Sequence, residues 1–485
     1  MIVRLAVRSL ATRPMRTAVL SIGFGLSIAV MAELLGVGEV ILEQAHAPAL
    51  AGGGDVVVTG AFGALENARF VTADVLGSGQ FRPRVAAVSP SRRATLYLLS
   101  ANANGPIAVR AGIPSRERAV GDPEVAGQAA WPDDPRDTAW IDPKPGELLR
   151  AMDRFHPSPV QPTAAPGPSS ARGGVAEKVA GTASSVGGFA EWLYFNARSA
   201  DGGERFYLTF MAGAADAGGA RPMLVRLQLN RGGAPANFSA LGAVADRDLL
   251  DRAPDLDVAG NRVRVTDDGR YAISLSLRDQ SGATLTGDLV LTPNPGRSIP
   301  PAAIHGARGW VSGYTVPVLS GVFTGTLRVG TDTLRVDGMA GYHDHNWGFW
   351  EGVRWQWGQV ASGDLSIVFG RVFPPADIAD PSRMPGILGV IGPQGPIAFS
   401  TNVSIREEDD RGTPRAVVVQ ARDRQVQLTL RLDVRESVRT AMALTRDASG
   451  EMTFLQLGGE YHVTGRAAGR DVDFNARGSA ETFRR

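Results

Sequence analysis

The amino-acid sequence predicts a mainly β protein whose C-terminal part forms two tandem antiparallel β-barrels. Short stretches of alternating apolar and polar residues recur from residue 189 onward, and turns rich in Gly and Asp separate them. The 485-residue chain also contains 59 Gly and 31 Pro. Regular short strands joined by turns are typical of sandwiches and barrels. Because the chain is too long for one ordinary core, we expect several domains.

The composition excludes some classes of function. The 50 basic residues nearly balance the 49 acidic ones, so the overall charge does not favour a nucleic-acid partner. The chain has no cysteine, which excludes disulfides, thiolate metal sites and cysteine nucleophiles. The sequence also lacks a phosphate loop, a dinucleotide fingerprint and a nucleophile elbow. We therefore expect no cofactor.

The N-terminal residues predict a membrane anchor. Residues 1–16 form a basic lead-in with no acid, and residues 17–42 are mostly apolar and long enough to cross a bilayer. The basic flank predicts a single-pass protein of the cytoplasmic (inner) membrane with its body on the periplasmic side. A cleaved signal peptide is one alternative, because Ala45-His46-Ala47 has the small-x-small pattern of a cleavage site. A buried soluble helix is the other, and the lead-in argues against it through Arg4, Arg8, Arg13 and Arg16.

Two segments precede the barrels. Residues 43–156 are predicted to form a small mixed extracytoplasmic segment with a helix around Pro145–Phe155, and they contain no evident catalytic grouping. His46 and His156 are isolated, so we expect them to be surface or capping residues. Residues 157–188 are rich in Pro, Ala, Gly and Ser, which predicts a flexible linker.

The two predicted barrels span residues 189–335 and 336–485. Each half has about 150 residues and opens with a phrase of aromatic residues and asparagine, at 191–196 and again at 342–347. Eight-stranded barrels of this size enclose one small ligand. This organisation predicts an apolar small molecule as the partner.

Residues 341–358 contain two histidines, an acid between them and four tryptophans. Such a density of tryptophan predicts either a packed seam in the core or an aromatic-walled pocket. If residues 342–346 are extended, His343 and His345 share one face, and Asp344 shares the opposite face with Tyr342 and Asn346. A second strand at 353–360 places alternate residues on one face, namely Val353, Trp355, Trp357 and Gln359.

Residues 191–196 together with Gly341–Gly348 resemble the carotenoid 1,2-hydratase (hydroxyneurosporene synthase) family. The shared core reads Tyr-x-Asp-His-x-Trp-Gly, and Gly313–Pro317 and the ending at 478–483 support it. The same superfamily contains lipocalin-like proteins encoded beside ABC-transporter permeases. The resemblance covers residues 189–485 and implies two lipocalin-like barrels. For hydratase members it also implies cofactor-free addition of water to an isoprenoid double bond.

The first 60 residues resemble the start of a macrolide-exporter type of ABC-transporter permease, through Val3–Leu20 and Gly52–Thr59. The later membrane helices of such a permease are missing, because no second apolar run of about 18 residues follows. The chain therefore cannot form a transport path alone. The resemblance implies an accessory role beside ABC transporter subunits.

Hydration of an alkene requires a proton donor and a group that stabilises the carbocation. Asp344 among aromatic rings is the predicted donor, with Tyr342, His343 and His345 completing the catalytic set and a histidine orienting the water. Aromatic ring faces stabilise the cation. The residues predicted to contact the ligand are Glu191, Trp192, Tyr194, Asn196, Tyr314, Asn346, Trp347, Trp350, Trp355 and Trp357.

Three other interpretations of this stretch stay open. The same residues could line a ligand pocket without chemistry, or form a hydrogen-bond network that ties strands together. A metal could bind His343 and His345, with His305, His462 or a carboxylate as third ligand. Two histidines alone do not establish a metal, and we expect none. The leading hypothesis is a membrane-anchored protein that binds a lipid or isoprenoid beside an ABC-type exporter, and the alternative is a hydratase that uses Asp344.

Overall fold

The structure is a computed structural model that describes residues 54–59, 65–77 except 66, 81–99, 104–122, 132–134, 143–159 and 188–484 except 233, 411 and 443–451, with Thr12, Met15 and Val125 as isolated positions. Two compact units divide the chain: residues 1–72 with 83–138, and residues 73–82 with 139–485. The predicted membrane helix at 17–42 lies outside the described residues, as does most of the predicted linker. Of the helices in the described ranges, none is long and apolar enough to cross a membrane.

The described residues before position 139 include one β-hairpin and three helices. Two antiparallel strands, β1 (Ser91–Leu99) and β2 (Asn104–Gly112), pair along their whole length. The helices are α3 (Ala68–Gly77), the 3-10 helix η1 (Arg82–Arg84) and α4 (Pro114–Ala119). Pro114 begins α4 at a position where a missing backbone N–H leaves no hydrogen bond unmade.

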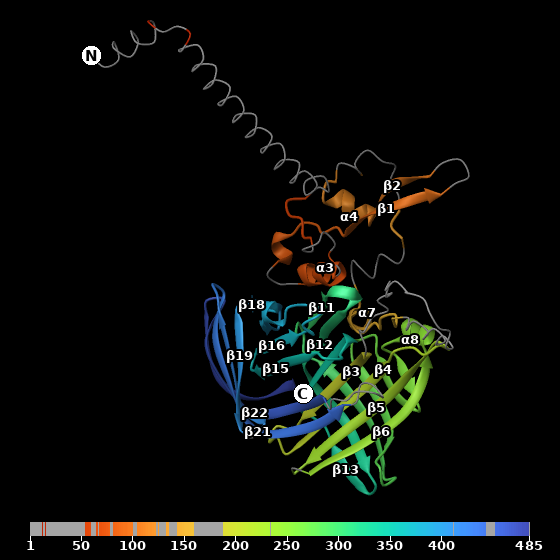
Figure 1. Ribbon diagram of the computed structural model, residues 1–485, viewed down its shortest axis with the longest axis vertical. Coiled ribbons are helices and arrows are strands. Elements are labelled where there is room, and N and C mark those ends of the chain that lie inside the picture. The colour runs from red at the N-terminus through yellow and green to blue at the C-terminus, as the bar shows by residue number, and fades with distance from the viewer. Residues whose placement is uncertain are drawn as a thin grey trace, which may run out of the picture. The chain divides into compact units, whose positions relative to one another are not determined.

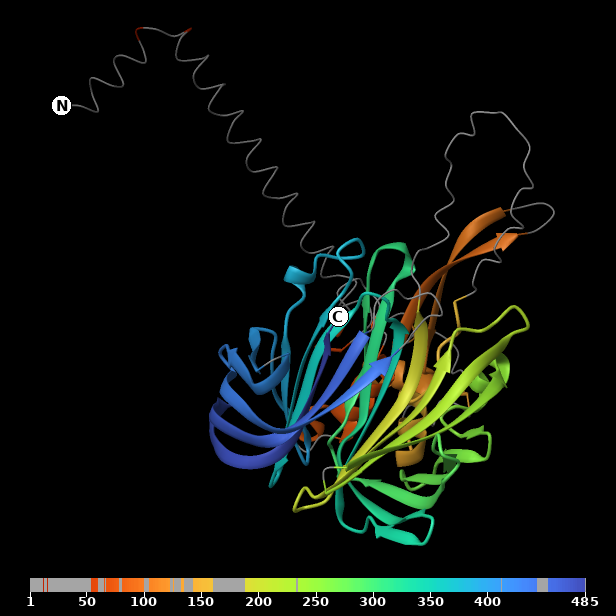
Figure 2. The same ribbon diagram turned by 60° about the horizontal axis from the view of Figure 1, so that its bottom comes forward.

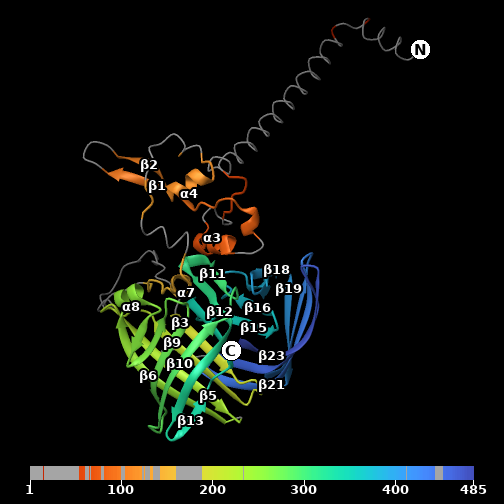
Figure 3. The same ribbon diagram turned by 180° about the vertical axis from the view of Figure 1, so that it is seen from behind.

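Eight antiparallel strands form the predicted first barrel, which is confirmed as a closed sheet (Figures 1 and 3). Its neighbours run β3, β4, β5, β6, β9, β10, β12, β14 and back to β3. The strands are β3 (Phe189–Arg198), β4 (Glu204–Gly213), β5 (Ala220–Arg231), β6 (Ala234–Ala245), β9 (Tyr271–Arg278), β10 (Thr284–Pro293), β12 (Val311–Val329) and β14 (Met339–Phe349). Accessory elements are α8 (Asp246–Arg252), β7 (Leu256–Val258), β8 (Asn261–Val265), β11 (Ile299–His305), η3 (Ala307–Gly309) and β13 (Asp332–Arg335).

Side chains from its own strands fill the interior of this barrel. Alternate residues of each strand point inward, as the buried–exposed alternation of β8 and β9 shows. Leu193, Phe195, Phe206 and Phe210 belong to one buried apolar cluster with residues of the other barrel strands. The barrel interior therefore contains an extensive buried apolar core, and the small apolar ligand expected for a barrel of this size stays a prediction.

Helix α7 (Pro145–Met152) lies at one end of the barrel (Figure 1) and confirms the predicted helix near 145–155. It starts with a capping box, in which the Lys144 backbone N–H donates to Glu147 at 3.0 Å, and with a proline in its first turn. Leu149 of α7 joins the barrel core. The chain then continues into the barrel, where Asp153 and Phe155 are buried.

The second sheet is an open half-barrel of nine antiparallel strands, shown in blue beside the barrel in Figure 2. Its order is β18 (Gly395–Ser400), β17 (Ile387–Gly392), β16 (Leu365–Phe373), β15 (Arg354–Ser362), β23 (Arg470–Arg484), β22 (Met452–Ala467), β21 (Val426–Met442), β20 (Thr413–Arg422) and β19 (Val403–Asp410). The 3-10 helix η4 (Pro381–Arg383) lies between β16 and β17.

The prediction of a second closed barrel is wrong, because β18 and β19 do not pair with each other in the described part of the sheet. Strands β15 to β17 bury both faces. Val360 and Ile367 pack into the core of the half-barrel, whereas Trp357 and Val368 pack against residues of the first barrel. Because the neighbouring barrel covers this apolar face, closure is not needed to remove it from water.

The two sheets divide between residues 349 and 354, whereas the sequence placed the boundary between 335 and 336. The difference is strand β14. It pairs with β12 on one side and β3 on the other, so it closes the first barrel. The aromatic phrase at 342–347 thus ends the first sheet and does not open the second.

Candidate functional site

Strand β14 presents its two faces to different surroundings, as the alternation in its sequence predicted. His343 pairs with Phe195 of β3 and His345 with Leu193, two residues whose side chains lie in the barrel core. Tyr342 belongs instead to the buried cluster between the barrel and the half-barrel. The predicted separation of His343 and His345 from Tyr342, Asp344 and Asn346 is confirmed.

An aromatic layer separates the two sheets. We define it by its rings: Trp192, Tyr194, Tyr207, Tyr314, Tyr342, Trp350, Trp355 and Trp357. The ring centroids of Trp192 and Trp350 are 4.5 Å apart, and those of Trp350 and Trp355 are 4.9 Å apart. The rings of the tryptophan-rich stretch therefore pack against one another, as both arrangements predicted from its composition require, a seam of the core and the wall of a pocket.

Asp344 lies in this layer with only neutral hydrogen-bond partners among the interactions that the structure shows. The Tyr342 hydroxyl donates to its Oδ2 at 2.7 Å, and the Asn346 amide donates to its Oδ1 at 2.7 Å. Burial is the main cause that raises the pKa of Asp344 well above its usual range, and the nearby Glu481 carboxyl raises it further. Both causes favour the protonated form of Asp344, in the direction that the sequence predicted for a proton donor.

Glu481 of β23 is a second carboxyl in the aromatic layer, and sequence reasoning missed it. It pairs with Trp357 across the β15–β23 ladder and is 7% exposed. Burial raises its pKa to about 7, although hydrogen bonds from Tyr194 and Gln456 act in the opposite direction. In the sequence, Glu481 stands in the ending at 478–483. That stretch was used as support for the family resemblance, and no role was predicted for its acid.

Tyr314 joins Asp344 to the half-barrel. Its hydroxyl lies 3.3 Å from the Tyr342 hydroxyl and accepts a hydrogen bond from the Trp357 indole N–H. The rings of Tyr342 and Trp357 are 4.9 Å apart. A chain of hydroxyl and indole groups thus leads from the acid into the second sheet.

On the opposite face of β14, His343 and His345 belong to a separate cluster inside the barrel. We call this the barrel-side cluster: Asp153, His156, Glu191, Arg221, Tyr271, His343 and His345. His343 bonds Asp153 Oδ2 at 2.9 Å through Nε2 and the Tyr194 carbonyl at 2.9 Å through Nδ1. Because both ring nitrogens are engaged there, His343 does not join Asp344 in one site, which separates the predicted catalytic set.

Glu191 is the centre of this cluster. His345 Nε2 lies 3.0 Å from Glu191 Oε1, and His156 Nδ1 lies 2.8 Å from the same oxygen. The Arg221 guanidinium donates to Oε2 at 3.4 Å. Burial alone would raise the pKa of Glu191, but hydrogen bonds from His156 and His345 outweigh it, so the pKa lies below its usual range.

One expectation about the residues before the barrels is corrected here. His156 was expected to be isolated, as a surface or capping residue. Instead the segment after α7 brings Asp153 and His156 to the histidines of β14. Sequence spacing did not suggest this because the partners lie more than 150 residues apart.

The predicted ligand-contacting residues divide between the two faces. Trp347 lies on the barrel side, where its ring stacks on His156 with centroids 4.2 Å apart. It lies over Gly313, where an added Cβ would be 1.9 Å from the indole, so only glycine fits. Asn196, 9% exposed, pairs with Tyr342 across β3 and β14. The remaining rings belong to the aromatic layer, and His305 and His462, the other proposed metal ligands, are exposed and outside both groups.

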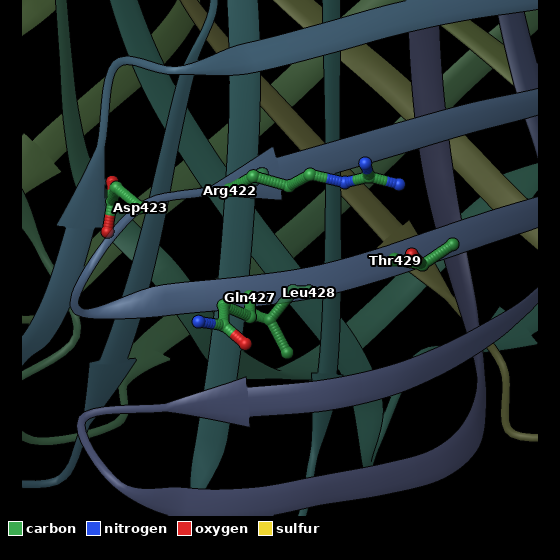
Figure 4. A pocket seen from close by; sticks show the side chains of 6 residues that line it. Arg422, Asp423, Gln427, Leu428 and Thr429 are labelled. Carbon is green, nitrogen blue, oxygen red and sulfur yellow. The ribbon is translucent and has the colours of Figure 1, made fainter.

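A surface hollow of about 420 Å³ lies elsewhere, on the hairpin between β20 and β21. Figure 4 shows the side chains along this hairpin. The lining residues are Ala421, Arg422, Asp423, Gln427, Leu428 and Thr429, and none was predicted to be functional. The hollow brings together no set of groups that suggests chemistry.

No protein-family model and no curated protein sequence matches the chain. Solved structures similar to it include a protein from Nitrosomonas europaea described as an AttH, at 17% identity over 61% of this chain and 92% of that chain, with a TM-score of 0.43. Kievitone hydratase from Nectria haematococca has 13% identity over 61% and 88% of the two chains, with a TM-score of 0.39. CghA has 12% identity over 61% and 87%, with a TM-score of 0.35. These likenesses concern the path of the chain alone, and no chemistry is taken from them.

Proposed function

We propose that the aromatic layer binds an apolar unsaturated molecule, such as an isoprenoid, and that Asp344 protonates it so that water adds to a double bond. The observation that carries this proposal is the surroundings of Asp344. Its hydrogen-bond donors are neutral and its pKa lies well above the usual range. A carboxyl that keeps its proton near neutral pH is the acid that alkene hydration requires.

The proposed reaction has two steps. Asp344 transfers its proton to one alkene carbon, and the π electrons form the new C–H bond, which leaves a carbocation on the other carbon. Water then bonds to that carbon and loses a proton to the carboxylate of Glu481. Transfer of this proton back to Asp344 restores both groups, and the net change is addition of one water molecule.

Two features of the layer support these roles. The pKa of Glu481, about 7, leaves part of its population ionised near neutral pH and ready to accept a proton. The Tyr342 and Trp357 rings lie 4.9 Å apart beside Asp344, and aromatic faces attract a cation. His343 and His345 have no part in this chemistry, because they face the barrel core.

Binding without chemistry is the second candidate. The contacts among Trp192, Trp350 and Trp355 favour it, because indoles packed in tilted and edge-to-face pairs also form the wall of a carrier for apolar molecules. The membrane anchor at 17–42 and an association with an ABC-type exporter stay proposals that rest on the N-terminal sequence. Protease protection of the N-terminal segment in intact membrane vesicles tests the anchor.

Turnover with heavy-oxygen water distinguishes the two candidates. The full chain, purified in detergent from an isoprenoid-producing host, is incubated with extracted isoprenoids in H₂¹⁸O and analysed by mass spectrometry. We expect a product that has gained one labelled water, and at least about a 100-fold loss of its formation in Asp344→Asn. Ligand co-purification should persist in that variant, because asparagine keeps the shape of the side chain and one of its two acceptor oxygens.

Asp433→Asn is the matched control, because Asp433 is an exposed acid of the half-barrel that pairs with Arg431. It should hydrate like the unsubstituted chain. If the unsubstituted chain and every variant return only unmodified ligand, the hydratase proposal is wrong and binding without chemistry is the better candidate. If Asp344→Asn fails to fold, Glu481→Gln gives the test, since loss of the proposed base should also stop label uptake.

A further inference from the structure

We propose that His156, Glu191 and His345 form a binding site for one divalent transition-metal cation, with Zn²⁺ as the typical occupant. One ligand atom from each residue lies within 4.8 Å of the other two. Two imidazoles with one carboxylate are a ligand set that zinc uses, with the fourth position left to water. The site lies on the face of β14 opposite Asp344, so it goes beyond the proposed hydration.

The geometry converges on one oxygen. His156 Nδ1 and His345 Nε2 lie 2.8 and 3.0 Å from Glu191 Oε1. Two ligands of a tetrahedral zinc, each about 2.0–2.1 Å from the ion, are separated by about 3.3 Å. A bound cation therefore requires the two contacts with Glu191 Oε1 to open by a few tenths of an ångström and the two imidazole nitrogens, now within 4.8 Å of each other, to take the same spacing.

Arg221 does not compete for that oxygen. Its guanidinium contacts Glu191 Oε2 at 3.4 Å and lies 3.6 Å from Asp246. Three carboxyl groups, those of Glu191, Asp153 and Asp246, lie around the single guanidinium of Arg221, so acidic groups outnumber the arginine at this site.

The surroundings of His345 are those of a metal ligand. Its second nitrogen, Nδ1, lies 3.3 Å from the Met152 carbonyl and 3.7 Å from Asp153 Oδ1. Metal-binding histidines almost always donate their other N–H to such a group, which fixes the ring and its tautomer. Asp153 Oδ1 is buried and makes no hydrogen bond within the described part of the chain, so it is available for this contact.

Access comes from His156. Its side chain is 41% exposed, whereas the side chains of Glu191 and His345 are fully buried. A cation can therefore enter past His156, and water can occupy the fourth position. Once bound, the cation would join the segment after α7 to strands β3 and β14.

The test uses the full chain in detergent without a polyhistidine tag, stripped with a chelator and titrated with Zn²⁺ by calorimetry. We expect one Zn²⁺ per chain and a rise in the melting temperature on binding. Co²⁺ as a spectroscopic probe should give the intense visible absorption of a four-coordinate ion. His156→Ala should weaken Zn²⁺ binding at least ~100-fold, because removal of a ligand costs no less than loss of its supporting contacts.

His462→Ala is the matched control, because His462 is exposed and bonds Asn475 on the half-barrel. It should bind Zn²⁺ like the unsubstituted chain. Equal binding by the unsubstituted chain and His156→Ala would mean an adventitious ion only and would overturn the site, as would no binding at all. Because the readout is metal binding, a negative result leaves the hydration proposal untouched, and absence of hydration leaves the metal site untouched.

Discussion

Two buried carboxyls on neighbouring strands, Glu191 and Asp344, differ in the sign of their pKa shifts. Both are nearly inaccessible, at 0% and 4% exposure. Glu191 faces two histidines and Arg221, and its pKa falls below the usual range. Asp344 faces a tyrosine, an asparagine and a second acid, and its pKa rises. The comparison teaches that hydrogen-bond donors and charges can reverse the effect that burial has on a carboxyl.

The largest expected effect comes from removing Glu191, which is the carboxyl with charged neighbours. Glu191→Ala takes the nearer of two carboxylates from the buried Arg221 guanidinium and the shared acceptor from His156 and His345, so we expect a loss of about 3–5 kcal/mol in the free energy of unfolding. Tryptophan fluorescence during urea unfolding measures it. The control Asp257→Ala removes an exposed pair with Arg262 and should cost about 0–1 kcal/mol. Equal losses in the two variants would contradict the assigned role of Glu191.

The acids of the aromatic layer can be tested through the pH dependence of the free energy of unfolding. The pKa of Glu481 rises from 4.5 to about 7 on folding, so the folded chain keeps a proton that the unfolded chain releases. Its contribution to stability is therefore present below about pH 4.5 and is lost as the pH rises towards 7. The loss totals about 3 kcal/mol.

Glu481→Gln should remove this loss, so the variant gains stability relative to the unsubstituted chain between pH 4.5 and 8. Urea midpoints across that range provide the measurement. Glu408→Gln is a control of opposite sign, because a hydrogen bond from Arg431 lowers the pKa of Glu408. Its contribution is present at neutral pH and is lost as the pH falls through the folded pKa. If the stability of both variants changed with pH in the same direction, the predicted difference between Glu481 and Glu408 would be wrong.

The smallest effects concern single hydroxyls on the two faces. Tyr271 donates to Asp153 at 2.5 Å, and Tyr342 donates to Asp344 at 2.7 Å. Tyr342→Phe should cost about 2–3 kcal/mol, because it leaves Oδ2 of the buried Asp344 without its donor, and Asn346 donates only to Oδ1. Tyr271→Phe should cost about 1 kcal/mol, since the same oxygen of Asp153 keeps its bond with His343. Thermal unfolding gives both values, and a reversed order would argue against this account.

The local sequence pattern was enough to predict which side chains of a strand share a face and where some turns lie. The two-residue period of a strand placed His343 and Asp344 on opposite faces, and the same rule separated Trp355 and Trp357 from Gln356. Turns rich in Gly and Asp were expected between the strands, and in one of them Asp279 accepts a hydrogen bond from the Ala283 backbone N–H. These features depend on residues close together in the chain.

The partners of those residues could not be predicted in the same way. Asp153, Arg221 and Glu481 come from a loop after a helix, from β5 and from the last strand, and only the closed sheet and its neighbour bring them to β14 and β3. Strand pairing over such separations leaves no trace in local composition. For the same reason the sequence did not reveal that β14 completes the first sheet or that the second stays open.

The position of Asp153 and His156 has a consequence for how the chain can be divided. A fragment starting at residue 189 would keep every strand of both sheets, yet it would leave His343 and His345 facing an interior without their carboxylate and imidazole partners. Such a fragment would therefore have to bind residues 143–159 as a separate peptide from solution. Covalent continuity through residues 160–187 replaces that bimolecular encounter with an effective local concentration. Cleavage there should make stability of the fragment depend on the amount of peptide 143–159 supplied, as in fragment complementation.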